Sequence, residues 1–292
     1  MKDIYVQIPA YRDRELLPTI ASLFEQAACP DRLRVALLWQ YGQDEVNLER
    51  LLSRFEHLEV LAWPAHQSQG CNWARQILQE QWAGEPYTLF LDSHHRFASS
   101  WDIQVIDMLE ALRNSGVNKP ILTAYLPPYD PANDPDMRSD CILKIRSAGR
   151  EQGMLFRLEG DPVTNRADLQ QPLAANFVSL HFLFGDGELN RDIAIDPALY
   201  FYVDEIAISL RAWSRGYELY HPHKILGWHL YNRSTRVTHW RDNPQARTQH
   251  EITLKRVRTL YSGRWFGKFG LGNQRSVADY EARIGEPLIQ NL

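Results

Sequence analysis

The sequence predicts an α/β protein built on a mostly parallel central sheet. From residue 4 to residue 91, short β-rich runs alternate with amphipathic runs, which is typical of strands joined by right-handed helical crossovers. The apolar run at 87–91 then stops abruptly at Asp92, Ser93 and His94, as a buried strand does where it reaches the edge of a sheet. Because ligands of open α/β sheets bind just outside the carboxyl ends of strands, we expect a binding site at this edge.

The first 124 residues supply most of the predicted sheet and its helices. Leu16, Ile20 and Leu23 recur at helical spacing, so they mark one apolar face of the first helix. The same reading along the chain predicts strands at 4–8, 33–39, 58–62, 87–91 and 121–124, and helices at 15–28, 45–55, 71–82 and 101–113.

The second part of the chain changes in texture. Pro, Asp and Asn signal turns after Leu126, and 141–146 with 154–158 read as a hairpin, so we interpret about 125–175 as a β-rich insertion without a core of its own. A strand is expected at 177–184, a sharp loop at 185–188, a helix at 204–215 and short strands at 218–221 and 225–229. A polar helix follows at 244–260, whereas the tail from Tyr261 shows no clear pattern. We therefore predict one domain over 1–240, with 241–292 as a C-terminal helical extension packed on it.

Composition limits the classes of function. The 292 residues carry 44% hydrophobic and 23% charged side chains and a net charge of −4, which is ordinary for a globular protein and argues against binding nucleic acid through bulk charge. No run approaches the ~20 apolar residues of a membrane span. Three cysteines without a zinc or disulfide spacing, and a first segment without a signal-peptide core, predict a cytoplasmic protein.

Three features can carry chemistry. Asp92 and His94 are two residues apart, so on extended backbone they point to the same side and can bind a divalent cation together. Asp204 and Glu205 open a helix, and His229 follows a short strand. Each feature has a plainer explanation: a satisfied polar cluster at a strand end, acids that complement a helix dipole, or a hydrogen-bonded histidine. Their combination in this order points to a site.

The same residues carry a resemblance. Asp92-Ser93-His94 resembles the Asp-X-His form of the metal motif of GT-A glycosyltransferases, and 204–216 with Gly227-Trp228-His229 resembles the catalytic region of polypeptide α-N-acetylgalactosaminyltransferases. The similarity is closer to the cytoplasmic hydroxyproline N-acetylglucosaminyltransferases that modify Skp1. It rests on blocks 5–13, 92–97, 181–187, 196–202 and 229–233, and it spans roughly 3–240. Asp204 departs from that family, which has two glutamates where this chain has Asp204-Glu205.

The resemblance implies a GT-A fold and a UDP-sugar donor. It implies that Asp92, His94 and His229 hold Mn²⁺ or Mg²⁺, with His95 as a weaker alternative. Two groups of residues are assigned to the donor: Pro9, Ala10, Tyr11 and Arg12 to uridine, and Gly70, Arg75, Asp92 and Ser93 to the base and phosphates. Asp186 is a candidate for sugar hydroxyls, and Asp204 and Glu205 would lie near the sugar and the acceptor. Arg233, Arg236 and His239 could close over the diphosphate or form a solvated basic face.

By the same resemblance, the expected reaction is a retaining transfer of a sugar, either by same-face substitution or through a covalent intermediate, with GlcNAc ahead of GalNAc, glucose and galactose. The acceptor is an unidentified hydroxyl group, of protein hydroxyproline, Ser or Thr or of a glycan. Two other functions use the same residues. One is a metal-dependent hydrolase, although the sequence has no His-rich motif such as H-E-x-x-H. The other is a non-catalytic module that binds a sugar or a protein.

Overall fold

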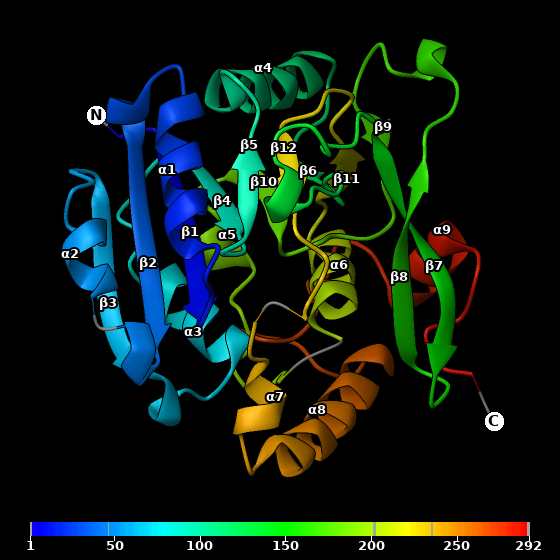
Figure 1. The fold of residues 1–292 in the computed structure, drawn as a ribbon. Helices are drawn as coiled ribbons and strands as arrows, with labels where there is room; N and C mark the ends of the chain where they lie inside the picture. The colour runs from blue at the N-terminus through cyan, green and yellow to red at the C-terminus, as the bar shows by residue number, and fades with distance from the viewer. Residues whose placement is uncertain (1, 46, 201–202, 235, 291–292) are drawn as a thin grey trace.

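The computed structural model describes residues 2–45, 47–200, 203–234 and 236–290. In these ranges eight strands form a central sheet in the order β3-β2-β1-β4-β10-β6-β11-β9 (Figure 1). The strands are β1 (Ile4–Tyr11), β2 (Leu33–Tyr41), β3 (Leu58–Pro64), β4 (Tyr87–Leu91), β6 (Pro120–Thr123), β9 (Leu173–Ala174), β10 (Phe182–Asp186) and β11 (Glu218–His221). Strands β3, β2, β1 and β4 run parallel, as do β6 and β11, whereas β10 and β9 run antiparallel to their neighbours. The predicted α/β class with a mostly parallel sheet is confirmed.

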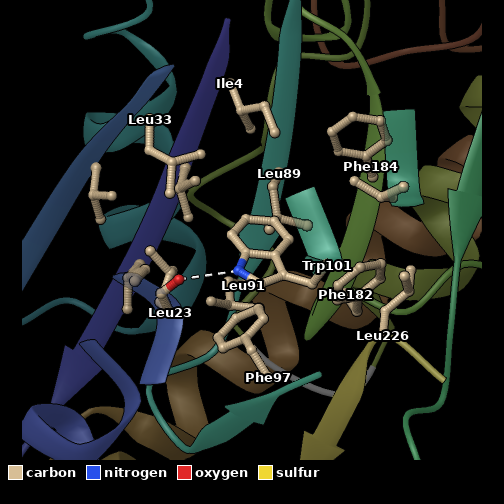
Figure 2. Close-up of a cluster of buried hydrophobic side chains, with 14 of the residues drawn as sticks. Ile4, Leu23, Leu33, Leu89, Leu91, Phe97, Trp101, Phe182, Phe184 and Leu226 are labelled. Atoms are coloured by element: carbon tan, nitrogen blue, oxygen red, sulfur yellow. Dashed lines mark hydrogen bonds between the residues drawn. The ribbon is translucent and has the colours of Figure 1, made fainter. Parts of the chain in front are cut away.

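Helices cover both faces of the sheet because the side chains of each strand alternate between them. Ile4, Val6 and Ile8 of β1 pack with α1 (Leu16–Gln26), α2 (Leu48–Leu52) and α4 (Trp101–Asn114). Trp101 fills the middle of this core, where its ring N–H donates to the carbonyl of Leu23 at 3.0 Å (Figure 2). Tyr5 faces the other way, toward α3 (Cys71–Gln79), and that face also carries α5 (Leu189–Asp192) and α6 (Asp204–Ser214).

A second core joins the predicted insertion to the C-terminal segment. The hairpin of β7 (Leu143–Glu151) and β8 (Leu155–Pro162) shares one apolar cluster with α6, α8 (Ala246–Tyr261) and α9 (Val277–Ile284). The tail after Tyr261 supplies Leu271, Tyr280 and Leu288 to this cluster, all buried, although its sequence showed no pattern. The hairpin therefore buries its apolar side chains in a shared core.

Two very short strands bring distant residues together. β5 (His95–Phe97) and β12 (Gly227–His229) form a separate antiparallel pair, with His229 opposite His95. Gly227 is required here because an added Cβ atom would collide with the carbonyl oxygen of Arg96. This pairing sets His229 beside the residues that follow β4.

Several predicted boundaries were wrong. Residues 177–181 are buried without being a strand, because their N–H groups donate to side chains: that of Val178 to Ser209, that of Ser179 to Thr123 and that of Leu180 to Glu205. Gly185 and Asp186, expected in a loop, still belong to β10. The predicted helix at 45–55 contains only the short α2, and the predicted strand at 225–229 begins at Gly227. No helix in the described ranges is both long and apolar enough to cross a membrane.

Candidate functional site

Three side chains meet at the carboxyl end of β4. Asp92 follows β4, His94 comes just before β5, and His229 ends β12. The Oδ2 atom of Asp92 lies 3.8 Å from Nε2 of His94 and also 3.8 Å from Nε2 of His229. The three ligand atoms lie within 4.8 Å of one another. The structure therefore brings together the three residues that the sequence assigned to a metal.

The donor set fits a divalent cation. Nε2 of His94 and Nε2 of His229 are buried and have no hydrogen-bond partner within the described ranges. Burial lowers the pKa of His229 well below its ordinary value, so its imidazole is neutral and can donate a lone pair. Burial alone would raise the pKa of Asp92, but His229, Arg75 and His94 outweigh it and hold that pKa well below its usual range. A carboxylate with two imidazole nitrogens suits Mn²⁺.

Asp13, which sequence reasoning missed, fixes the orientation of His94. Its Oδ2 atom lies 2.7 Å from Nδ1 of His94 and accepts a hydrogen bond from the Ser93 hydroxyl at 2.8 Å. With Nδ1–H held by this carboxylate, the lone pair of Nε2 faces the other two ligands. The sequence offered two signals: Asp13 follows the first strand, which ends at the same edge of the sheet as β4, and it closes block 5–13 of the family resemblance.

Aromatic rings fix His229 in turn. The ring of His181 stacks on it at 4.1 Å, and the ring of Tyr231 meets it edge-on at 4.4 Å. His95, the weaker metal candidate, instead places Nδ1 3.1 Å from the carbonyl oxygen of Asp92. His95 is fully buried behind the site.

The acid pair lies beside the metal ligands. Arg75 forms ion pairs with Asp92 and with Asp204: its Nη2 atom lies 2.8 Å from Asp92 and its Nη1 atom lies 3.3 Å from Asp204. Glu205 accepts hydrogen bonds from the hydroxyl of Ser179 at 2.7 Å and from the N–H of Leu180 at 3.1 Å. Burial and the neighbouring Asp204 raise the pKa of Glu205 to about 7.

Three cavities adjoin along this edge. One of about 390 Å³ is lined by Asp92, His229 and the acid pair, and it extends to the residues of β8. A second, of about 150 Å³, shares Asp92 with it and is also walled by Tyr11. A third, of about 680 Å³, shares Tyr11 with the second and lies over the ends of β1 and β2. Together they extend from the ends of the first strands, past the metal ligands, to the hairpin.

The four residues assigned to uridine lie in different surroundings. Tyr11 and Arg12 line the largest cavity, and both donate to Asp242 of α7 (His239–Asp242), at 2.9 and 2.8 Å. Pro9 lines the smallest cavity. Ala10 is buried in the apolar core, so its side chain faces away from all three.

The residues assigned to the phosphates also differ in position. Ser93 lines the smallest cavity and donates to Asp13, whereas Arg75 reaches the carboxylates described above. Gly70 is the N-cap residue before α3 and has a φ of +112°, and the ring of Tyr200 lies 2.9 Å from where a Cβ of residue 70 would stand. The close approach permitted by Gly70 is therefore to a tyrosine ring.

The segment after His229 reaches all three cavities. Arg233 and Arg236 line both cavities that contain Asp92, and His239 lines the largest and the smallest of the three. The ring of His239 is held by the Tyr200 hydroxyl, 2.6 Å from its Nδ1 atom. Phe201 and Tyr202, part of the block at 196–202, lie outside the described residues.

The prediction for Asp186 was wrong. This residue pairs with Tyr87 at the start of β4, so it lies at the opposite end of the sheet from Asp92. Its carboxylate forms an ion pair with Arg113 of α4. The error has a physical reason: β10 runs antiparallel to β4, so the residues that end β10 lie where β4 begins.

A mixed α/β sheet with a candidate carboxylate–imidazole metal site at its carboxyl edge, next to a cavity over the first two strands, has the architecture of a GT-A glycosyltransferase. The chain belongs to the glycosyltransferase (GlcNAc) family, whose model matches residues 3–54 and 43–287. The match extends almost to the C-terminus and includes most of the segment predicted as an extension. Membership of this family favours a transferase over the metal-dependent hydrolase and the binding module.

Solved structures share the fold at low sequence identity. The crystal structure of GalNAc-T7 with UDP, GalNAc and Mn²⁺ aligns with 99% of this chain, at a TM-score of 0.63 and 12% identity, and the alignment spans 55% of GalNAc-T7. Residues 1–349 of S. aureus TarS align with 79% of the chain at a TM-score of 0.53 and 13% identity, spanning 60% of that structure. The complex of TarS 1–349 with UDP-GlcNAc aligns with 90% of the chain, spanning 73% of that structure, at a TM-score of 0.53 and 12% identity. No curated protein sequence matches this chain.

Proposed function

We propose that this protein transfers GlcNAc from UDP-GlcNAc to a hydroxyl acceptor with retention of configuration, using Mn²⁺ or Mg²⁺ held by Asp92, His94 and His229. The observation that carries the proposal is the position of three possible ligand atoms, one from a carboxylate and two from imidazoles, all within 4.8 Å of one another, at the junction of two cavities. The family description names GlcNAc, and the related folds were solved with UDP-GlcNAc or with UDP and Mn²⁺.

Different parts of the UDP-sugar donor would bind in different cavities. Tyr11 and Arg12 would contact the uridine in the largest cavity, and Arg236 would neutralise charge on the diphosphate near Asp92. The bound cation supplies positive charge that stabilises the diphosphate as it leaves. Asp204 and Glu205 would accept hydrogen bonds from sugar hydroxyls on the far side of Asp92.

The proposed transfer requires no protein base. The bond from the anomeric carbon to the β-phosphate oxygen breaks, and the acceptor oxygen bonds to the anomeric carbon on the same face. The acceptor proton passes to the leaving phosphate, and UDP is released. Cytoplasmic location is also part of the proposal, and the three free cysteines agree with a reducing compartment.

Calorimetric titration of UDP with and without Mn²⁺ tests the metal site. We expect Asp92→Ala to weaken Mn²⁺-dependent UDP binding by about 100-fold or more, because it removes a ligand that both cavities share. Asp186→Ala is the matched control, because this aspartate lies at the other end of the same sheet. Hydrolysis of UDP-GlcNAc, UDP-GalNAc, UDP-glucose and UDP-galactose then ranks the donors, with UDP-GlcNAc expected first. A wild-type protein without UDP affinity in the presence of Mn²⁺ refutes the proposal.

A further inference from the structure

The cavity of about 390 Å³ has a wall that the donor site does not use. Three successive residues of β8 line it: Phe156, Arg157 and Leu158. Successive side chains of a strand point to opposite faces of its sheet. Three in a row along one cavity therefore indicate that β8 presents its backbone edge to the cavity.

The twist of the hairpin explains this orientation. At its open end β7 faces the body of the protein, since Leu143 bridges to Tyr125 and the N–H of Ile145 donates to His221 at 3.1 Å. The register then shifts between Ser147 and Arg150. Such bulges increase the twist of a ribbon, and beyond this one β8 lies on the side of α6 (Figure 1).

The edge of β8 is free in the part of the chain that the structure describes. The hairpin is a two-stranded sheet, so β8 pairs with β7 on one side and with no other strand. In an antiparallel ribbon, every second residue turns its N–H and C=O groups away from its partner. These groups match the backbone of another extended chain.

The side chains on this side of the cavity favour a peptide as the acceptor. The hydroxyl of Tyr231 donates a hydrogen bond to the carbonyl of Leu126 at 2.7 Å, so Tyr231 can contact a ligand through its ring but not through that hydrogen. Phe156 and Leu158 are apolar. Arg157 is exposed and makes no ion pair with any residue in the described ranges. On the wall formed by β8, apolar side chains flank one exposed cation, which fits an extended chain with an acidic side chain.

We propose that the acceptor is an acidic polypeptide segment that adds as a strand to the free edge of β8 and so carries its hydroxyl group to the donor site. The inference rests on the proposed function, because the same cavity contains Asp92 and Asp204. Main-chain hydrogen bonds to β8 supply affinity, and the pairing with Arg157 favours acidic sequences.

Transfer from UDP-GlcNAc to defined acceptors tests the binding mode. The probes are ten-residue peptides with a central Ser, Thr or hydroxyproline, flanked by Asp and Ala or by Lys and Ala. Each peptide is also made in two N-methylated versions, one for each set of alternate residues, because an N-methyl group removes a backbone N–H donor. N,N′-diacetylchitobiose serves as the glycan acceptor for comparison. We expect acidic peptides to exceed basic ones about tenfold in kcat/KM, a typical factor for one charge-assisted contact, and one N-methylated set to lose transfer.

A charge reversal tests the role of Arg157. Arg157→Glu is expected to reverse the preference between acidic and basic peptides, whereas Lys144→Glu, an exposed cation of the same hairpin outside the cavity, is expected to preserve it. Transfer is expressed relative to hydrolysis of UDP-GlcNAc by the same preparation, so that donor-site damage is divided out.

Three results overturn the inference: chitobiose as a better acceptor than every peptide, equal transfer to both N-methylated sets and their parent, or donor hydrolysis without transfer to any peptide. Each leaves the proposed function intact. The proposed function fails separately, through the absence of Mn²⁺-dependent UDP binding.

Discussion

Replacing Asp13 with Asn changes one side-chain atom beside His94 of the proposed metal site. The Oδ2 atom of Asp13 lies 2.7 Å from Nδ1 of His94 and accepts the Ser93 hydroxyl at 2.8 Å, while Oδ1 accepts the N–H of Glu15 at 3.0 Å. Asn can keep the Glu15 contact only by turning its NH₂ group toward His94. A donor would then face Nδ1–H, and the ring would relieve the conflict by moving its proton to Nε2. A protonated Nε2 cannot bind a cation.

The magnitude follows from this geometry. Partners that orient a metal-bound histidine are worth about 10- to 100-fold in metal affinity, or about 1.4 to 2.7 kcal/mol. We expect Asp13→Asn to weaken Mn²⁺ binding toward the upper end of this range, because Asp13 is 4% exposed and water cannot replace its carboxylate. Mn²⁺ binding is measured by the electron paramagnetic resonance signal of free Mn²⁺, which requires no substrate.

The control is a second buried aspartate in a different role. Asp102 is 3% exposed, accepts the N–H groups of Ala28 and Cys29, both at 2.8 Å, and lines none of the three cavities. Asp102→Asn is expected to lower the melting temperature and leave Mn²⁺ affinity unchanged. Wild-type Mn²⁺ affinity in Asp13→Asn, with a cooperative melt that shows it is folded, would refute the reasoning about His94.

Two further predictions concern Glu205 and Gly227. The pKa of Glu205, raised to about 7 by burial and Asp204, means that this carboxyl favours the folded state below its ordinary pKa and loses that contribution as pH rises toward 7. The wild-type protein should therefore lose at most about 3 kcal/mol of unfolding free energy between pH 4.5 and pH 8, as measured by urea titration. The Glu205→Gln protein should not show this loss. An identical pH profile in both proteins contradicts the assignment. Gly227→Ala should displace β12 at a cost of about 1–3 kcal/mol, because its Cβ meets the carbonyl of Arg96, and should weaken Mn²⁺ binding through His229. Unchanged Mn²⁺ affinity in a folded Gly227→Ala protein would show that β12 can shift without moving His229.

Sequence reasoning could propose Asp92 and His94 as metal ligands because their signals are local. Asp92 and His94 share one side of a short segment, and an apolar run before each ligand marks the end of a strand. Asp13 and His181 escaped detection because their roles depend on packing. Asp13 is 81 residues from His94 in sequence, and the ring of His181 matters only because it stacks on His229.

Strand direction caused the error at Asp186. The run at 182–186 has the same apolar character as its neighbours, and apolar character does not reveal whether a strand runs parallel or antiparallel. Its antiparallel pairing with β4 decides that Asp186 lies at the wrong end of the sheet.

The sequence by itself determined the α/β class, because periodicity is a property of neighbouring residues, and its resemblance to a known family suggested Asp92, His94 and His229 as metal ligands. Only the tertiary structure decided that Asp13 holds His94, that the tail after Tyr261 completes a second core, and that β8 turns a free edge toward the cavity. These features depend on how strands pair and twist over long separations in sequence, and such pairing is set by the packing of the whole chain.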